Sequence, residues 1–271
     1  MKQFLANLYT YVMARPAFKK FNTYLVKIGL KGLGLLYSHE DTKNNGESFF
    51  MKTAIHDFKV SNLFDVGANK GNYARLFMEL GFKNDIYCFE PHPTTFNYLN
   101  DAISIDQVKK FNIGFSKESG SFPIFDYAAE DGSEHASLFK DVIEKVHKGE
   151  TISHLATVTT IDEFVEVNNV LSIGLLKIDT EGNEYNVLSG AQKSLKNNKI
   201  DYIHFEFNEM NVVSRVFLKD FFILLENFNL YRLLPSDFLP LTYDHSLMNE
   251  LFSYQSIVAI RKDLDIYRKL A

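Results

Sequence analysis

The segment Asn62–Tyr73, with the sequence NLFDVGANKGNY, limits more than any other what this chain can fold into. Its pattern is that of a short buried strand, a tight glycine turn and the start of a helix. Asp65 closes the strand, and Gly67 and Gly71 let the backbone pass close to a ligand without a Cβ in the way. The first amides of the helix would face the same ligand. The segment therefore predicts an α/β fold with a ligand-binding turn after a strand.

The glycine spacing of this turn does not fit the common nucleotide-binding motifs. A dinucleotide fingerprint needs glycine where the chain has Asn69 and Asn72. A P-loop needs Gly-Lys-Ser/Thr, which does not follow. The turn suits a cofactor that has an amino-acid tail and no pyrophosphate, because Asp65 and nearby carbonyls can hold the amino group of such a tail.

A second predicted strand ends in Glu90, 19 positions after Gly71. A carboxylate at this place can accept hydrogen bonds from both hydroxyls of a ribose, and its charge disfavours a ribose phosphate. Each feature alone is common in proteins. Their order and spacing together predict a cofactor site rather than a purely structural βαβ unit.

From Phe49 onward, short apolar runs alternate with helical patterns. The predicted strands are Asn62–Val66, Ile86–Glu90, Lys110–Phe115, Leu175–Asp179, Tyr202–Phe207, Leu230–Leu234 and Gln255–Arg261. The predicted helices are Tyr73–Leu80, Thr94–Ala102, Ile161–Val167, Tyr185–Leu195 and Val216–Phe228. This order predicts a doubly wound, Rossmann-like α/β domain with a mostly parallel, seven-stranded sheet covered on both faces. Because only a loop is expected between the last two strands, the final strand is expected to be antiparallel.

Residues 123–152 interrupt the alternation with a polar stretch that includes His135 and His147. A long insertion before the fourth strand is where a substrate-facing loop or lid would lie.

The first 48 residues are expected to form a basic helical extension and linker, and residues 49–271 the main domain. Between Met1 and His39 there are six basic residues and no acidic one. We favour a helical lid over the substrate pocket, but a homodimer contact and a peripheral surface for anionic lipid or a lipid-linked glycan stay open. So does a helix that simply packs on the core.

Composition excludes several classes of protein. The single cysteine excludes a disulfide framework and a multi-cysteine metal site. The net charge of −5 argues against nucleic-acid binding by bulk attraction. No apolar run is long enough to span a bilayer, so a cytoplasmic protein is expected.

Four motifs resemble the FkbM-type methyltransferases. They are FDVGANKGNY (64–73), CFEPHPTTFNYL (88–99), FNIGFSKESGSF (111–122) and LLKIDTEGNEYNVLSGA (175–191). The resemblance implies the class I methyltransferase fold, S-adenosylmethionine as cofactor, and O-methylation of a hydroxyl, often on a sugar, a glycan precursor or a related natural product.

The resemblance also implies roles for individual residues. The residues expected to line the methionine half of the cofactor are Asp65, Gly67, Asn69 and Gly71. Glu90 is expected to hold the ribose, and Phe115 and Ser116 to meet the adenine. The chain departs from the family in one place: Ser-Ser-Leu is frequent there, and this chain has His135-Ala-Ser-Leu.

Catalysis is expected at the carboxyl ends of the strands, where Asp179 and Glu206 lie on neighbouring predicted strands. This carboxylate pair could coordinate Mg²⁺, which would lower the pKa of a substrate hydroxyl. Alternatively, one of the two acts directly as general base, and His135 is a third candidate for that role. His204 fits a hydrogen-bonded core residue better than a catalyst, and Lys177 could pair with a neighbouring acid.

Other readings of the sequence remain open. A nucleic-acid methyltransferase lacks support because no Pro-Pro-aromatic motif follows the fourth strand, and a nicotinamide oxidoreductase because the glycine spacing is wrong. A protein or small-molecule acceptor, or a non-catalytic scaffold that binds the cofactor without turnover, fits the same motifs.

Overall fold

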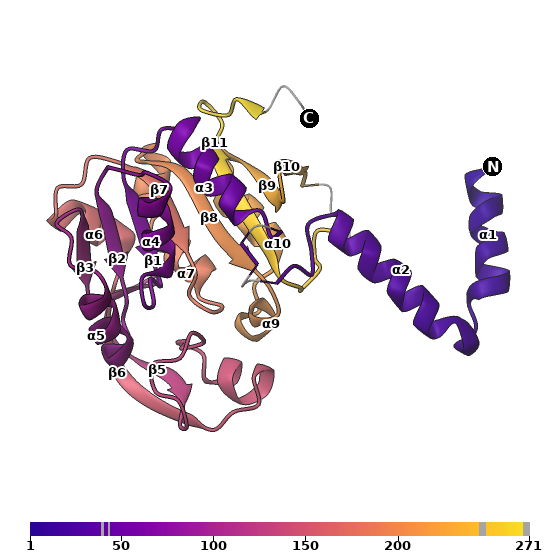
Figure 1. Cartoon of the computed structure of the whole chain (residues 1–271), viewed down its shortest axis with the longest axis horizontal. Coiled ribbons are helices and arrows are strands. Elements are labelled where there is room, and N and C mark those ends of the chain that lie inside the picture. The colour runs from indigo at the N-terminus through magenta and orange to yellow at the C-terminus, as the bar shows by residue number, and fades with distance from the viewer. Residues whose placement is uncertain (39–40, 43, 244–247, 268–271) are drawn as a thin grey trace.

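An eight-stranded sheet lies at the centre of the molecule (Figure 1). The computed structural model describes residues 1–38, 41–42, 44–243 and 248–267. The strand order is β10-β9-β11-β8-β7-β1-β2-β3. In chain order these strands are β1 (Leu63–Val66), β2 (Ile86–Phe89), β3 (Val108–Phe111), β7 (Ile173–Ile178), β8 (Ile200–Phe207), β9 (Phe228–Leu234), β10 (Asp237–Leu241) and β11 (Gln255–Arg261).

The strands from β3 to β8 run parallel, and β11 is antiparallel between β8 and β9. This confirms the predicted doubly wound, mostly parallel sheet with an antiparallel last strand. The predicted count of seven strands is wrong, because the expected loop before the last strand contains β10, which pairs with β9. Pro240 lies within β10, and a proline is tolerated there because β10 is an edge strand.

Helices cover both faces of the sheet, as the alternation along β1 requires. Leu63 belongs to one buried cluster, and Phe64 and Val66 to the other. The helices of the Leu63 face are α3 (Glu47–His56), α4 (Asn72–Glu79) and α5 (Pro93–Ala102). Those of the opposite face are α6 (Ile161–Val167), α7 (Glu184–Ser189), α8 (Gln192–Lys196) and α10 (Leu218–Leu224).

Three of the five predicted helices are confirmed to within a residue or so, in α4, α5 and α6. The prediction of one helix over Tyr185–Leu195 is wrong, because the chain bends at Gly190 between α7 and α8. A Cβ on Gly190 would lie 2.2 Å from the carbonyl oxygen of Ser116, so the close packing requires glycine here. The prediction Val216–Phe228 is too long, since Phe228 already begins β9. The short α9 (Met210–Ser214) precedes α10.

A second, three-stranded sheet is made by β4 (Gly114–Phe115), β5 (Gly120–Tyr127) and β6 (Thr151–Thr159), in the order β4-β6-β5. The predicted third strand Lys110–Phe115 is therefore wrong at its end. The main-sheet strand stops at Phe111, and Asn112 donates a hydrogen bond to the carbonyl of Glu90 at 2.8 Å. Phe115 then enters the second sheet. The predicted loop 123–152 is wrong at both ends, because it contains the end of β5 and the start of β6, two strands absent from the prediction. Their antiparallel pairing holds the rest of the insertion.

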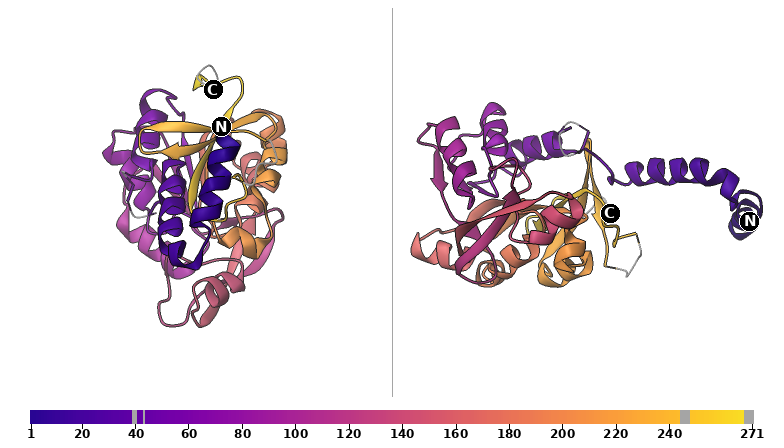
Figure 2. Two further views of the ribbon diagram at one scale, coloured as in Figure 1. Left: turned by 90° about the vertical axis from the view of Figure 1, so that its right-hand side faces the viewer. Right: turned by 90° about the horizontal axis from the view of Figure 1, so that it is seen from below.

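The N-terminal helices α1 (Lys2–Met13) and α2 (Lys19–Gly32) contain no buried residue. They extend away from the domain (Figures 1 and 2), so α1 and α2 do not form the predicted lid, although Tyr37 after α2 lines the pocket. After α2 the chain returns to the domain, where Leu35 and Asn45 are fully buried. Among the described residues, no helix is long and apolar enough to cross a membrane.

Candidate active site

A cavity of about 840 Å³ opens at the carboxyl ends of β1, β2, β7 and β8. Ligands of open α/β sheets bind at this edge. The insertion between β5 and β6 supplies one wall, through residues that include Ser133, His135, Leu138 and His147. The expectation that the insertion faces the pocket is consistent with this placement.

The turn between β1 and α4 forms another wall. Its backbone has positive φ at Gly67 (76°), Asn69 (49°) and Gly71 (80°). Close packing also requires glycine at two of these positions. A Cβ on Gly67 would lie 1.7 Å from the carbonyl oxygen of Asp179, and one on Gly71 would lie 2.6 Å from Ile103. Gly67 and Asn69 line the cavity, whereas Gly71 supports the turn from behind.

Glu90 lies at the cavity wall directly after β2 and is almost fully buried. Its Oε2 accepts a hydrogen bond from the Asn69 amide at 2.9 Å, and its Oε1 one from the His92 amide at 2.8 Å. Burial raises the pKa of Glu90 to about 7. Because each carboxylate oxygen can accept more than one hydrogen bond, the carboxylate is fixed in place and still able to accept from a ligand.

Asp65 does not line the cavity, and its predicted contact with a ligand stays a prediction. It is fully buried, and Lys177 lies between it and the cavity. The Lys177 ammonium is 3.3 Å from Asp65 Oδ1 and 3.2 Å from Asp179 Oδ2. The predicted pairing of Lys177 with a neighbouring acid is confirmed. Burial opposes the charge on Lys177, but Asp179 and Asp65 outweigh burial and raise its pKa.

Of the two residues expected to contact the adenine, one lines the cavity and the other does not. Phe115 lines the cavity, although it belongs to the second sheet. Ser116 does not line it. Its amide donates to the Thr159 carbonyl at 3.0 Å, and its hydroxyl lies 3.5 Å from Asn183.

Asp179 and Glu206 both line the cavity, at the ends of β7 and β8. Burial raises the pKa of Glu206 well above its usual value, and the nearby charge of Asp179 adds to this. A hydrogen bond joins Glu206 to Tyr254. The raised pKa favours the protonated form of Glu206, which is a poorer base than a carboxylate. The fixed cation beside Asp179 is the ammonium of Lys177.

His135 faces a carboxylate that the sequence did not identify as its partner. His135 Nδ1 lies 3.4 Å from Oε1 of Glu181, and the imidazole ring stacks on His147 with a centroid distance of 4.2 Å. The hydrogen bond with Glu181 is the largest cause of the raised pKa of His135. His204, by contrast, bonds Tyr73 and Ser256 inside the core, as expected.

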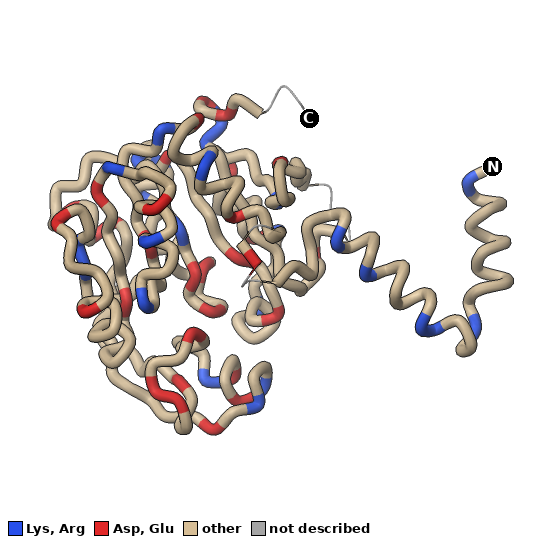
Figure 3. The backbone as a smooth tube through the Cα atoms, in the orientation of Figure 1, with Lys and Arg blue, Asp and Glu red and all other residues tan. Residues whose placement is uncertain are grey.

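The cavity wall is strongly acidic. Two basic side chains line it, Arg75 and Lys177. Eight acidic side chains line it as well: Glu47, Glu79, Glu90, Glu134, Asp179, Glu181, Glu206 and Glu209. Burial raises the pKa values of Glu47, Glu90 and Glu206, but the remaining acids still favour cationic or neutral ligands over anionic ones. Figure 3 shows acidic residues of several elements around the carboxyl edge of the sheet.

With the edge strand β10 left aside, the main sheet has the chain order 3-2-1-4-5-7-6, and the seventh strand alone is antiparallel. This topology, with a glycine turn after the first strand and an acid after the second, defines the class I methyltransferase fold. Within that class, the chain belongs to the FkbM methyltransferase family, since the model described as "Methyltransferase FkbM domain" matches residues 65–229. The resemblance seen in the sequence is thereby confirmed.

Two curated proteins are similar to the chain. The 2-O-methyltransferase NoeI of Sinorhizobium fredii is 23% identical over 156 residues, which cover 55% of this chain and 64% of NoeI. The hexuronic acid methyltransferase AglP of Haloferax volcanii is 26% identical over 196 residues, 70% of this chain and 74% of AglP. The chain thus spans just under two thirds of NoeI.

Among solved structures, the methyltransferase FkbM of Methylobacillus flagellatus aligns with a TM-score of 0.44 at 11% identity. The alignment covers 77% of this chain and 47% of that protein.

Proposed function

We propose that the protein transfers a methyl group from S-adenosylmethionine to a hydroxyl oxygen of a sugar or glycan. The observation that carries this proposal is the carboxylate of Glu90, which two backbone amides hold at the cavity wall beside the Gly67–Asn69 turn. A carboxylate after the second strand is placed to accept hydrogen bonds from ribose hydroxyls. The acidic wall supports a cofactor that carries a sulfonium and an ammonium group.

The remaining predicted cofactor residues take two kinds of role in this proposal. Gly67, Asn69 and Phe115 lie at the wall and would contact the cofactor directly. Asp65 and Gly71 would support the site without contacting the cofactor. Asp65 holds Lys177, and Gly71 lets the start of α4 pack closely on Ile103. We assign Ser116 no contact.

We propose His135 as the general base and Glu181 as the group that orients it. If Nδ1 of His135 donates its proton to Glu181, then Nε2 keeps a lone pair that can take the proton of the acceptor hydroxyl. Asp179 remains a second candidate because it also lies at the wall. The positive charge expected from Mg²⁺ beside Asp179 would come from Lys177 instead.

The acceptor we propose is a neutral hydroxylated sugar. NoeI is named a 2-O-methyltransferase, and AglP is named a hexuronic acid methyltransferase. In this chain the acidic wall would repel a uronate carboxylate, so a neutral sugar fits better. The same repulsion acts against a nucleic-acid acceptor.

Calorimetric titration with S-adenosylhomocysteine tests the proposal, with NADH as the matched control ligand. We expect micromolar binding of S-adenosylhomocysteine, no binding of NADH, and no change when EDTA replaces Mg²⁺. Binding of NADH, or of neither ligand, would contradict the cofactor assignment. Labelled methyl transfer to neutral oligosaccharides, compared with uronic-acid oligosaccharides, then tests the acceptor. Cofactor binding without transfer to any hydroxylated acceptor would indicate a non-catalytic scaffold.

A further inference from the structure

Three metal-ligating side chains meet outside the cavity, on three separate parts of the chain. His92 follows β2 and caps α5, Asp131 belongs to the insertion, and His154 lies on β6. Oδ1 of Asp131 lies 3.3 Å from Nε2 of His92 and 2.7 Å from Nε2 of His154. All three ligand atoms lie within 4.8 Å of one another. None of these residues lines the cavity described above.

One of the two spacings to Asp131 fits a tetrahedral site, whereas the 2.7 Å contact between Asp131 and His154 is a hydrogen bond that would have to lengthen around an ion. Bonds of about 2.0–2.1 Å from zinc to nitrogen or oxygen place neighbouring ligand atoms about 3.3 Å apart. The contact between His92 and Asp131 has this length, and Oδ2 of Asp126 lies 3.6 Å from the same His92 nitrogen. Two imidazoles and one carboxylate form a donor set that suits zinc-like divalent ions.

His92 gives an independent indication of a ligand. The residue is fully buried, and its Nε2 atom makes no hydrogen bond although two carboxylates lie nearby. Its Nδ1 lies 3.3 Å from the hydroxyl of Thr95. The Thr95 amide also donates to Nδ1 at 3.4 Å as the cap of α5, so binding of an ion through Nε2 requires the proton to lie on Nδ1 and to be donated to the Thr95 hydroxyl instead. Thr94 donates to Oδ2 of Asp131 at 2.8 Å and so orients the second ligand.

We propose that His92, Asp131 and His154 bind a zinc-like divalent cation that fastens the insertion to the end of β2. Water would complete the coordination, because the Oδ2 atom of Asp126 already accepts two amide hydrogen bonds. Asp126 accepts hydrogen bonds from the amides of Gly132 and Ser133, and the Ser133 carbonyl accepts one from Asn69 in the cofactor turn. The ion would thus hold the wall of the cavity from outside, without touching the reacting groups.

The test uses the untagged full-length protein and zinc alone as the probe. After equilibrium dialysis against zinc, elemental analysis is expected to find about one ion per chain, and zinc is expected to raise the melting temperature. Asp131→Asn and His154→Ala change partly exposed residues, so both variants should fold. In EDTA their melting temperatures should match the wild type. Each should lose the bound ion and the zinc-dependent rise, whereas His56→Ala, at an exposed histidine of α3, should keep both.

Two results would overturn the proposal. One is wild-type protein that holds no stoichiometric zinc. The other is zinc that persists in Asp131→Asn and His154→Ala but is lost in His147→Ala, which would assign the ion to His135, His147 and Glu181 instead. Neither result bears on S-adenosylhomocysteine binding, which is measured separately in EDTA.

The N-terminal helices carry a second, independent observation. The large apolar side chains of α1 and α2 are exposed to solvent: Phe4, Leu5, Leu8, Tyr9, Tyr11, Val12, Phe21, Tyr24, Leu25, Val26 and Ile28. An apolar surface of this extent is uncommon on a protein without a partner for it. Figures 1 and 2 show both helices standing clear of the domain, so the domain itself does not cover them.

Charge identifies the kind of surface that would cover these helices. Residues 1–38 carry six basic side chains and no acidic one, a charge of +6. The whole chain has 29 basic and 34 acidic residues, so the remainder carries 23 − 34 = −11. Apolar and basic side chains on the same exposed helices are typical of segments that lie in the interface of an anionic membrane.

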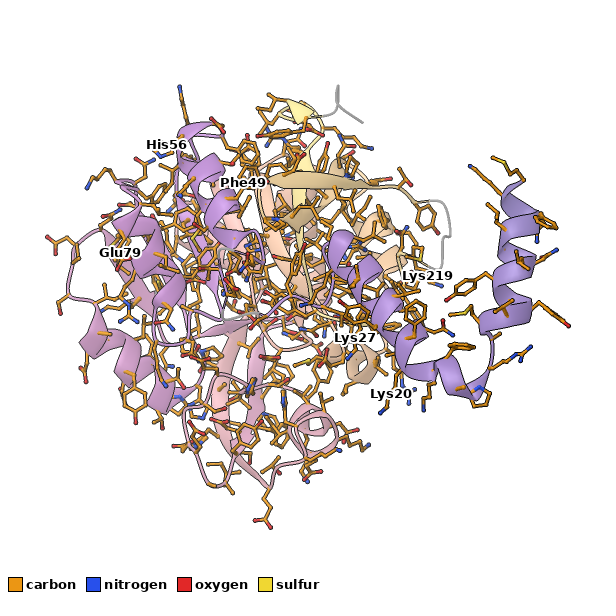
Figure 4. All side chains as sticks on the ribbon, turned by 45° about the vertical axis from the view of Figure 1, so that its right-hand side comes forward. Lys20, Lys27, Phe49, His56, Glu79 and Lys219 are labelled. Carbon is orange, nitrogen blue, oxygen red and sulfur yellow. The ribbon has the colours of Figure 1, made fainter. Side chains whose placement is uncertain are left out.

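We infer that α1 and α2 lie on an anionic bilayer and hold the acidic catalytic domain next to it. Lys20 and Lys27 on α2 and Lys219 on α10 are labelled in Figure 4. All three are exposed, but the first two lie on the extension and the third on the domain. This difference supplies a matched control.

Vesicle sedimentation with the full-length protein tests the inference. We expect binding to phosphatidylcholine vesicles that contain phosphatidylglycerol, and at least tenfold weaker binding to phosphatidylcholine alone. K20E/K27E should weaken binding to the anionic vesicles at least tenfold, whereas K52E/K219E, at exposed lysines of the domain, should not. Equal binding by both double variants would overturn the inference. So would a stable dimer that Phe4→Ser and Tyr11→Ser dissociate, in a protein that binds no vesicles.

Discussion

Asp65 and Lys177 stand directly opposite each other on β1 and β7, and the ammonium of Lys177 lies 3.3 Å from Oδ1 of Asp65. The carboxylate is fully buried, and its burial raises its pKa while Lys177 lowers it. Asp65, near the end of the first strand, therefore holds a lysine that lines the cavity. This ion pair connects the two strands on which the cofactor turn and Asp179 stand.

Removing the lysine should destabilise the fold. Lys177→Met leaves Asp65 buried without its cation, and loss of one partner of a buried ion pair costs about 3–5 kcal/mol. Urea denaturation should show this loss in the free energy of unfolding. The double variant K177M/D65N should be less destabilised than K177M, because the neutral amide is cheaper to bury than an unpaired carboxylate. If the two variants unfold at the same urea concentration, the pair does not contribute as described.

Glu90→Gln should weaken the binding of S-adenosylhomocysteine. The glutamine side chain has one oxygen and one NH₂ group, so it can accept a hydrogen bond from only one of the two backbone amides, those of Asn69 and His92. It also lacks the negative charge that strengthens hydrogen bonds to ribose. Hydrogen bonds to charged groups contribute about 1.5–3 kcal/mol, so the affinity should fall roughly 10- to 100-fold in calorimetry. Glu226→Gln, at an exposed position before β9, is the control and should bind like the wild type. Unchanged affinity in Glu90→Gln would remove the ribose contact.

Two glycine variants separate backbone strain from close packing. Both Gly67 (φ 76°) and Gly81 (φ 95°) have left-handed backbones, which cost a residue with a Cβ about 1–2 kcal/mol. A Cβ at Gly81 meets no atom within 4 Å, whereas one at Gly67 would overlap the Asp179 carbonyl. Gly81→Ala should therefore lose about 1–2 kcal/mol in unfolding free energy from strain alone. Gly67→Ala should lose about 1–3 kcal/mol more from overpacking. Equal losses would show that the approach of β1 and β7 is not tight in solution.

Features that depend on residues close together in the sequence could be predicted, whereas contacts between distant residues could not. The β1–α4 turn and Glu90 are local patterns, in which a strand, its glycines and the acid after it are close in sequence, so their placement at one cavity was foreseeable. The pairs Asp65–Lys177 and His135–Glu181 join residues far apart in the chain, and their contact depends on strand register and on the path of the insertion. No spacing rule in a single sequence reports that register.

The missed strands have a different cause. The missed strands are β4, β5, β6 and β10. Of these, β4 is short, β5 and β10 contain a proline, and β6 is mostly polar, so none gives the clear apolar alternation by which strands are recognised. The prediction extends the third strand to Phe115 because one apolar run continues across Asn112, whereas the structure divides that run between two sheets. Tertiary pairing, rather than local propensity, decides such boundaries.

The pH dependence of methyl transfer distinguishes His135 from Asp179 as the base. A base must be deprotonated, so the rate should rise with pH through the pKa of His135, which Glu181 raises above its usual value. Glu181→Gln removes that negative charge and lowers the pKa of His135. The acid limb of kcat/KM should then move to lower pH. His135→Gln should remove this limb and lower the rate by roughly 10²- to 10⁴-fold. If Asp179 is the base, Glu181→Gln leaves the limb where it is and Asp179→Asn abolishes turnover, so the two assignments predict opposite profiles for the same pair of variants.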